Sequence, residues 1–427
     1  MKRILGNVVE ADGVGKGVIT VDGGVIVDFQ RIDPRIAEDV LAIYGADNYY
    51  DNCLIFPGFI DIHTHCREDV TGKDNHKEDY ASVGRAALSG GVVCVADMPN
   101  NPVVPLDRAS YDAKEQIPLD HCPIDVLLYA GVGPDTQPFD RDGEFPYKVF
   151  LGPSTRSEDA LHFKHYAQLS TALARYRGKS VSFHCEDPTL LTIHKGLATH
   201  EERRAPICEW SAIDVATDFI EYHGLRGKIC HVSTADGMKT ILAKKAAGVN
   251  VTAEVTPHHL YFDTGMITEE NRHFLRMNPP IRSREDREFL LEMVRQDKFD
   301  FLATDHAPHT VEEKLRGISG VPQLDTYGPF VAWLIKEHGV SPEVIFRMAC
   351  QRPGEWVSSF LPEKKLGRIQ AGYEANVTVL DLSRPAVEGR PLYTKCNWSP
   401  FDLRQLPGMV KTVYYRGEKV VDEQYMK

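Results

Sequence analysis

The sequence lacks any cysteine pattern that would define a disulfide framework or a cysteine-based zinc site. Its nine cysteines are an odd number, are scattered over 427 residues and never occur with C-x-x-C spacing. Secreted disulfide scaffolds carry paired cysteines at close spacings, whereas a reducing compartment leaves thiols free. We therefore expect free cysteines and a cytoplasmic protein.

Long hydrophobic runs and basic clusters are also missing. A membrane helix needs about 20 consecutive apolar residues, and no uninterrupted apolar segment of the sequence approaches this length. The sequence starts with MKRILGNVVEADG, which has no apolar core of signal-peptide length. Lys and Arg (49) are outnumbered by Asp and Glu (61), which gives a formal net charge of −12. We expect neither a membrane nor a nucleic acid as partner. An anionic substrate would be repelled unless a local cationic site captures it.

What is present is the composition of a soluble globular protein, with 42% hydrophobic and 26% charged residues. Both ends of the chain contain short alternating apolar segments broken by glycine and aspartate, at residues 18–21, 25–27, 376–380 and 410–415. Such segments predict small antiparallel strands. We expect residues 1–54 and 366–427 to form one small β-sandwich domain from both termini.

The middle of the chain, residues 55–365, has a different pattern. Short apolar runs end in a polar residue and alternate with helical segments, one from Ser157 to Gly178 and others ending at Gly224 and Gly248. The runs lie at residues 54–62, 92–96, 124–130, 147–151, 180–183, 228–230, 249–255 and 299–304. Eight strands alternating with helices predict an α/β fold, a (β/α)8 TIM-type barrel whose active site lies at the carboxyl ends of the strands.

The first run leads into His63, His65 and Arg67. Alternate residues of a strand share one face, so these three side chains are expected to point the same way. Two imidazoles can bind a metal such as zinc, and a guanidinium can hold a carboxylate by two hydrogen bonds. Two solvated histidines at a strand end are the alternative.

Four further strand residues carry chemistry. Lys148 lies inside an apolar strand, where an ammonium must be paired, deprotonated or modified, and a carbamate formed on it could bridge two cations. His184 and His231 end successive strands, so either could be a ligand or a packed core histidine. Asp305 ends the last strand and could bind a metal, accept a proton from a metal-bound water, or simply cap a helix.

The roles of His258 and His259 stay open between orientation of ligands, packing and exposure. Cys66, Cys185 and Cys230 each adjoin a histidine, but neighbours in a strand face opposite sides, so we interpret them as small packing residues.

Taken together, these residues resemble the amidohydrolase superfamily and, within it, the dihydroorotase family, over nearly the whole chain. The motifs that carry the resemblance are Pro57 to His65, Met98-Pro99-Asn100, the Lys148 strand, the HCED and HVS histidines, Arg276 to Pro280, ATDHAPH around Asp305, and the closing segment 366–376. Residues 317–324 loosely resemble the family's glycine-rich substrate loop.

The resemblance implies a two-metal site, usually zinc, although histidine and carboxylate ligands also accept cobalt or manganese. Some dihydroorotases bridge their metals with aspartate, for which Asp140 or Asp142 would be remote candidates. The implied ligands are His63, His65 and Asp305 for one ion and His184 and His231 for the other, with carboxylated Lys148 and a hydroxide as bridges.

The resemblance also implies substrate contacts: Arg67, Asn100 and His309 on a carboxylate, with Asn278 near the ring. The implied reaction is reversible hydrolysis of L-dihydroorotate to N-carbamoyl-L-aspartate in pyrimidine synthesis, with Asp305 as proton shuttle. Dihydropyrimidinases, hydantoinases and allantoinases share the metal site but not the Arg67–Asn100 pair. A dihydropyrimidinase-like amidase and a non-catalytic assembly partner remain alternatives. We expect a small-molecule substrate and a homo-oligomer.

Overall fold

The apolar run at residues 54–62, expected to be one strand, forms two strands in different sheets. Strand β4 (Tyr49–Pro57) joins an eight-stranded sheet, and β5 (Phe59–Thr64) begins a barrel. Gly58 separates them, and a Cβ atom at this residue would lie 2.5 Å from the side chain of Val93. Only glycine permits such a close approach, so the chain can change sheet here. The apolar pattern could not reveal this break, because both strands are buried.

The computed structural model describes residues 1–427 except 37–39, 41–42, 44–47, 140–142, 154–158, 387–389, 403, 424 and 427. A search of the described residues finds no helix with the length and apolar character that crossing a membrane requires.

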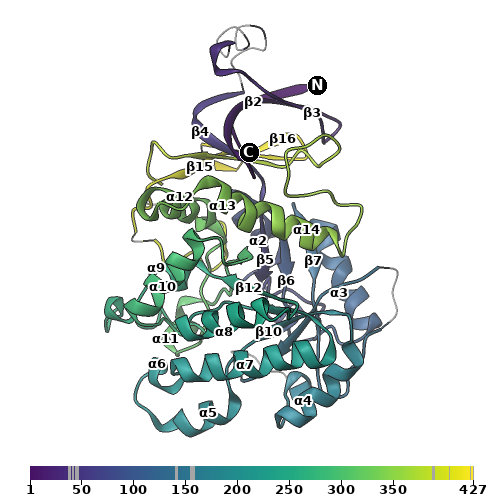
Figure 1. Cartoon of the computed structure of the whole chain (residues 1–427), viewed down its shortest axis with the longest axis vertical. Coiled ribbons are helices and arrows are strands. Elements are labelled where there is room, and N and C mark those ends of the chain that lie inside the picture. Colours follow the sequence, from purple (N-terminus) through teal and green to yellow (C-terminus); the bar gives the residue numbers. More distant parts are fainter. Residues whose placement is uncertain are drawn as a thin grey trace.

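Short parallel strands build the barrel in the lower part of Figure 1. Neighbouring strands pair in chain order, and a parallel bridge between Thr64 and His306 links the first strand to the segment after the last. Strands β7 and β8 both belong to the run 124–130, so the described part of the barrel has eight positions, as expected. The strands after β5 are β6 (Val92–Asp97), β7 (Asp125–Leu128), β8 (Ala130–Gly131), β9 (Tyr147–Phe150), β10 (Ser180–His184), β11 (Arg226–Ile229), β12 (Val251–Val255) and β13 (Phe301–Leu302).

Helices cover the outer face of the barrel, so that strands β5, β6 and β10 are buried along their whole length. The longer helices are α2 (Tyr80–Ser89), α3 (Arg108–His121), α4 (Tyr166–Leu173), α7 (Pro206–His223), α8 (Ala235–Ala246), α10 (Arg284–Arg295) and α12 (Tyr327–His338). Shorter ones are α5 (Pro188–Ile193), α6 (His200–Arg203), α9 (Pro257–Tyr261), α11 (Val311–Leu315), α13 (Pro342–Phe346) and α14 (Arg352–Ser358).

The expected helix ends are only partly confirmed. Helix α7 ends at Gly224, which has a left-handed φ of 63°, and α8 ends two residues before Gly248. The helix expected from Ser157 to Gly178 is wrong in its start and continuity: α4 begins after His165, whose ring accepts the N–H of Gln168. Ser157 itself lies outside the described residues.

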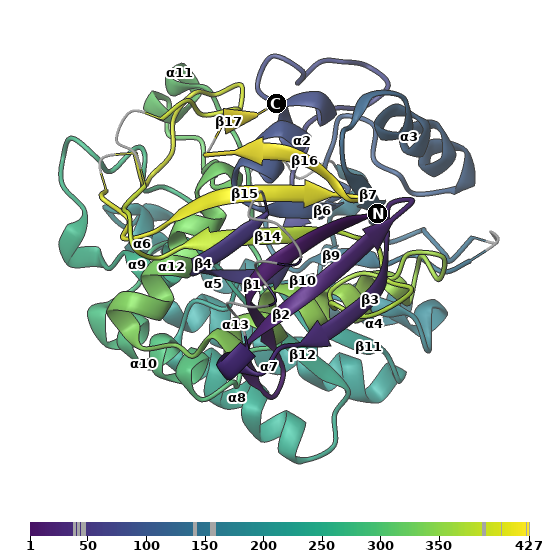
Figure 2. The same ribbon diagram turned by 90° about the horizontal axis from the view of Figure 1, so that it is seen from above.

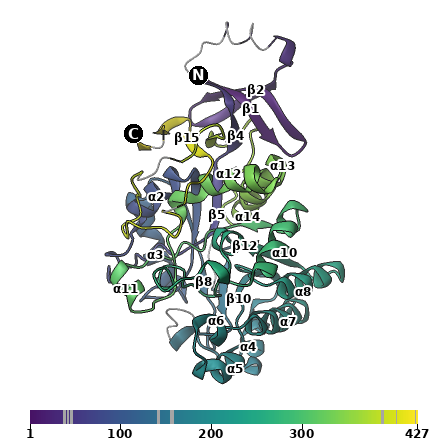
Figure 3. The ribbon, with the colours of Figure 1, turned by 90° about the vertical axis from the view of Figure 1, so that its left-hand side faces the viewer.

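Both termini contribute to the second sheet, which lies above the barrel in Figure 1 and is seen from above in Figure 2. Its order is β17-β16-β15-β14-β4-β1-β2-β3, antiparallel except for the parallel pair β1–β4. Helices α12 and α13 lie between this sheet and the barrel (Figure 3). The strands are β1 (Lys2–Glu10), β2 (Gly13–Asp22), β3 (Val25–Arg31), β14 (Val377–Asp381), β15 (Met409–Tyr415), β16 (Glu418–Asp422) and β17 (Tyr425–Met426). The expected sheet from both ends is thus present, while the limits 1–54, 55–365 and 366–427 stay a prediction.

Candidate metal and substrate site

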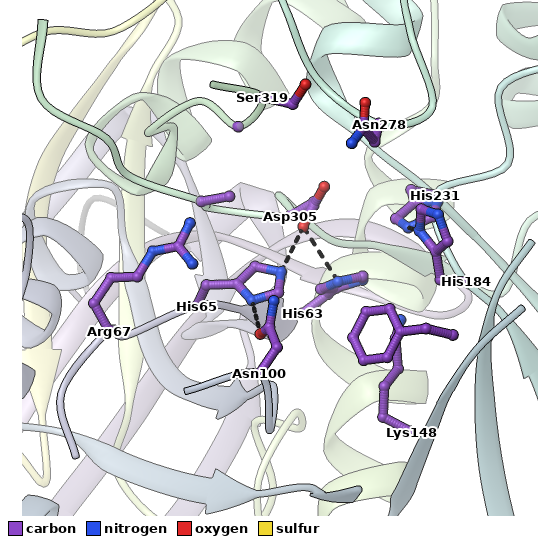
Figure 4. Close-up of a pocket in the computed structure, with 13 residues that line it drawn as sticks. His63, His65, Arg67, Asn100, Lys148, His184, His231, Asn278, Asp305 and Ser319 are labelled. Atoms are coloured by element: carbon purple, nitrogen blue, oxygen red, sulfur yellow. Dashed lines mark hydrogen bonds and ion pairs between the residues drawn. The ribbon is translucent and has the colours of Figure 1, made fainter. Parts of the chain in front are cut away.

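The strand ends meet in one pocket (Figure 4). All residues expected at the site line it except His309, which contacts Arg67. The lining residues are His63, His65, Arg67, Asn100, Lys148, Phe150, His184, His231, Asn278, Asp305, Ala307, Ser319 and Gly320. The structure therefore brings together residues that lie far apart in the sequence, from His63 to Gly320.

His63, His65 and Asp305 form the first cluster, with both histidines from the end of β5. The Nε2 atoms of His63 and His65 lie 3.2 and 3.0 Å from Oδ1 of Asp305. Their other ring nitrogens are held from behind: Nδ1 of His63 is 2.5 Å from Glu254, and Nδ1 of His65 is 2.6 Å from the Oδ1 atom of Asn100.

These contacts fix where the protons lie. Carboxylate and amide oxygens only accept hydrogen bonds, so each Nδ1 of His63 and His65 carries the proton. Burial is the largest cause that lowers the pKa of both rings well below the ordinary value, so they are neutral. Their Nε2 lone pairs then face the carboxyl group of Asp305, and burial raises the pKa of this group to about 7. Two lone pairs and a carboxyl oxygen converging within 3.2 Å are a donor set for a cation.

His184 and His231 form the second cluster. Nδ1 of His184 and Nε2 of His231 face each other at 3.0 Å, and Nε2 of His184 is held 3.0 Å from the Glu186 carboxylate. Burial raises the pKa of Glu186, but the Arg204 charge and the His184 hydrogen bond outweigh this and hold it at about 2. Glu186 therefore stays ionised and directs the His184 lone pair into the pocket.

Lys148 lies beside both clusters. Its side chain is fully buried in β9, and Nζ donates to Sγ of Cys230 at 2.9 Å. Among the residues that the structure describes, no carboxylate forms an ion pair with it. Lys148 lines the pocket. Cys230 is more than a packing residue, because it accepts this hydrogen bond.

Glu254 contacts several of these groups from outside the pocket lining. It binds His63 through Oε1 and the buried Lys228 ammonium through Oε2, each at 2.5 Å, and accepts the backbone N–H of His231. Ligand atoms of His63, Cys230 and Glu254 also lie within 4.8 Å of one another. Because Glu254 is already engaged by His63 and Lys228, we assign it to holding His63 in place.

Three site residues have left-handed backbone, with φ of 66° at Arg67, 36° at His231 and 50° at Asp305. Such conformations cost about 1–3 kcal/mol each in residues other than glycine and persist only where the surroundings impose them. Each lies two or three residues beyond the end of its barrel strand, where the left-handed backbone turns the chain and the side chain lines the pocket.

The wall beside the first cluster is cationic and polar. Arg67 is buried, its Nε donates to the carbonyl of Pro308, and its Nη2 lies 3.2 Å from Nε2 of His309. Asn100 has a role that the sequence did not show, because its oxygen holds His65. Its amide N–H groups are then the part that can meet an anion.

His258 and His259 lie outside the lining. His258 is 2.7 Å from the Gln323 amide, and His259 lies 2.8 Å from Thr256 and 3.1 Å from the carbonyl of Pro279, next to Asn278. Both rings are buried, so the expected alternative of exposure is not met, and the choice between orientation of ligands and packing stays open. The alternative bridging residues Asp140 and Asp142 lie outside the described residues.

Sequence reasoning missed several supporting residues. Glu254 is a charged residue inside a mostly apolar strand, which is the same signal that identified Lys148, whereas Lys228 shares its short strand with Arg226 and did not stand out in this way. Glu186, two residues after His184, gave no such signal. The same is true of Lys314, which donates to the carbonyls of Arg276, Ile318 and Gly320 at 2.7–2.9 Å.

Residues 54–420 match the Amidohydrolase family. The chain belongs to this family. The amidohydrolase is 31% identical to a dihydroorotase from Macrococcus caseolyticus over 96% of its own length and 98% of the relative. It is 30% identical to a dihydroorotase from Pyrococcus furiosus, over 87% of this chain and 82% of the relative.

Among solved structures, the amidohydrolase is similar to an L-hydantoinase (dihydropyrimidinase) from Arthrobacter aurescens, with a TM-score of 0.86 and 21% identity over 100% of this chain and 98% of the other. A D-hydantoinase from Thermus sp. gives a TM-score of 0.81 and 20% identity, over 99% and 95% of the chains. At these identities the likeness establishes the fold, a barrel with a sheet from both ends.

Proposed function

We propose that this amidohydrolase is a dihydroorotase, which reversibly hydrolyses L-dihydroorotate to N-carbamoyl-L-aspartate in pyrimidine synthesis. The observation that carries the proposal is the buried Arg67 guanidinium in the wall of a histidine- and carboxylate-lined pocket. In a chain with a net charge of −12, this cation gives an anionic substrate a place to bind. The dihydroorotases at about 30% identity support it.

Two divalent cations, most simply zinc, fit the donor set described above. His63, His65 and Asp305 would hold one, and His184 and His231 the other. Lys148 would lie between them as a carbamate, because carboxylation converts the buried cation into an anion that faces both clusters. When bound, such cations lower the pKa of a water molecule and polarise the carbonyl of a cyclic amide.

The chain's own residues supply binding and proton transfer. Arg67 and the amide of Asn100 bind the ring carboxylate, assisted by His309, and Asn278 lies on the opposite side of the pocket, near the ring. Asp305 accepts the proton from the attacking water and returns it to the departing ring nitrogen.

A hydantoinase- or dihydropyrimidinase-like activity is the competing function within the same fold. Such substrates lack the ring carboxylate and have no use for Arg67. The two functions therefore differ in what removal of the guanidinium does.

The deciding experiment compares dihydroorotate, hydantoin and dihydrouracil as substrates of the wild-type protein and of Arg67→Met. We expect turnover of dihydroorotate, and a loss of kcat/KM in the variant corresponding to about 2–5 kcal/mol, or roughly 30-fold to several thousand-fold. Arg67→Lys keeps the charge but not the geometry for two parallel hydrogen bonds, so its kcat/KM should lie between those of the wild type and Arg67→Met. Turnover of hydantoin but not of dihydroorotate by the wild type would reject the proposal.

A further inference from the structure

A chain of polar contacts starts at Arg67, in the pocket wall, and leads away from the pocket. Nη2 of Arg67 lies 3.2 Å from Nε2 of His309, and Nδ1 of His309 lies 3.0 Å from Oε2 of Glu313. The other carboxylate oxygen of Glu313 lies 2.7 Å from the buried Lys77 ammonium. His309 and Glu313 are held together as the i and i+4 positions at the start of α11, where Thr310 caps the helix.

These neighbours leave one arrangement of protons on His309. Arg67 only donates and a carboxylate only accepts, so Nδ1 carries a proton and Nε2 presents its lone pair to Arg67. Burial, followed by the charge of Arg67, lowers the pKa of His309 to about 3, so the free protein holds a neutral ring. The pKa of Glu313 is lowered despite its partial burial, because His309 and Lys77 both donate to it.

A carboxylate bound between Arg67 and His309 conflicts with this state. The Nε2 lone pair would face a carboxylate oxygen, and two acceptors repel. The ring cannot solve the conflict by moving its proton from Nδ1 to Nε2, because Nδ1 would then face the ionised Glu313. Only a second proton on the ring lets His309 donate to both carboxylates.

We propose that capture of the substrate carboxylate is coupled to uptake of one proton from solvent at Nε2 of His309, with Glu313 as the positioning residue. This inference rests on the proposed function, since it needs a substrate with a carboxylate. The proton binds the Nε2 lone pair and stays on the ring until the ligand leaves. Imidazolium is then flanked by two anions, the ligand and Glu313.

The charges around His309 allow this change only with an anion present. Arg67 approaches from the segment after β5, Lys77 from the segment before α2, and Lys314 from α11 itself, and all three disfavour a cationic ring. Glu313 favours it, and Trp398 contributes an uncharged contact through Nε1–H to the carbonyl of His309. A bound carboxylate neutralises Arg67 and adds its own attraction, which is strong in a buried pocket.

The coupling predicts a pH dependence that a neutral cyclic amide would not show. Where one proton is taken up per ligand, Kd rises about tenfold for each pH unit. Ligands without a carboxylate leave His309 neutral and bind without this dependence. The protonated His309 thus adds to Arg67 in selecting carboxylated rings.

Titration calorimetry of the metal-loaded enzyme with orotate, the planar carboxylated pyrimidine, tests the coupling. Measurements at neutral pH in buffers of different ionisation enthalpy count the protons taken up. We expect about one more proton in the wild type than in His309→Gln, which keeps an amide donor that cannot titrate. Glu313→Gln should reduce the uptake, and His76→Gln, at an exposed histidine, should leave it unchanged.

Equal proton counts and equal pH slopes of Kd in the wild type and His309→Gln would overturn the inference while leaving the function intact. The difference between these two proteins excludes protons exchanged elsewhere in the pocket. If the wild type neither binds orotate nor turns over dihydroorotate, the proposed function fails, and the inference fails with it.

Discussion

Nε2 of His65 and Oδ1 of Asp305 lie 3.0 Å apart, although 240 positions separate the two residues in the sequence. His65 follows the first barrel strand and Asp305 the last, and the barrel closes between them. A neutral imidazole lone pair directed at a carboxyl oxygen is a contact that a shared cation makes favourable. This pair therefore links closure of the fold to the chemistry of the site.

The first prediction concerns Asp305. Asp305→Asn removes the group that accepts and returns the proton. Loss of a general acid–base catalyst typically lowers a rate by about 10²–10⁴-fold, and kcat for dihydroorotate should fall by at least this factor. Steady-state kinetics and metal analysis of the same preparation check it. Asp112→Asn, on the outer helix α3, is the matched control and should keep full activity. A fully active Asp305→Asn would refute the shuttle.

The second prediction concerns metal removal and Lys148. Protein stripped by a chelator should be inactive, and divalent metal should restore more activity with bicarbonate than without it, because bicarbonate supplies the carbon dioxide for the carbamate. Lys148→Met should bind less metal and show no response to bicarbonate. Carbon-13 NMR after addition of labelled bicarbonate should show a carbamate resonance in the wild type only. Equal reactivation with and without bicarbonate, and no such resonance, would contradict carboxylation.

The third prediction concerns Glu186 and pH. Its pKa lies at about 2 in the folded protein, against an ordinary value of 4.5. A lowered carboxyl pKa stabilises the fold fully above the unfolded value and loses this contribution as pH falls toward the folded one. In urea denaturation with a chelator present, Glu186→Gln should therefore be less stable than wild type at pH 7. The gap should narrow below about pH 4.5.

Glu186→Gln should also weaken metal binding by about 10–100-fold, because Gln orients the His184 ring less firmly than a carboxylate does. A competition assay with a chromogenic chelator measures this. A pH-independent stability gap, or unchanged metal affinity, would show that Glu186 does not hold His184.

The fourth prediction concerns Lys314, whose three hydrogen bonds join the segment of Arg276 to the loop of Ile318 and Gly320. Lys314→Met fills the same space but removes a donor from all three carbonyls. The Arg276 carbonyl keeps the N–H of Gly320, whereas each buried carbonyl left unsatisfied costs about 1–3 kcal/mol. Since Asn278 and Ser319 line the pocket on these segments, KM for dihydroorotate should rise more than kcat falls. Faster hydrogen exchange at residues 316–321 should accompany it. An unchanged KM would mean that the loop is held by other contacts.

Local pattern was enough to predict the barrel and the residues at its strand ends. Apolar runs followed by His63, His65, His184, His231 and Asp305 identified the strands, and the polar residue after each run indicated a side chain at the carboxyl end of the barrel. The strand period of two accounts for His63 and His65 sharing a face. Lys148 was identifiable because a charged side chain in a buried strand is costly unless it is paired, deprotonated or modified. The sheet from both termini followed from the alternating ends.

Only the tertiary structure decided how these residues are held and charged. The break at Gly58 depends on the approach of Val93, and the proton positions on His63 and His309 depend on Glu254 and Glu313. Such partners come from other strands and segments, and a residue's own neighbours in the sequence do not indicate them. The sequence by itself determined which groups reach the pocket, and the fold decided which of their atoms face it, because burial and long-range hydrogen bonds act only after the chain has closed.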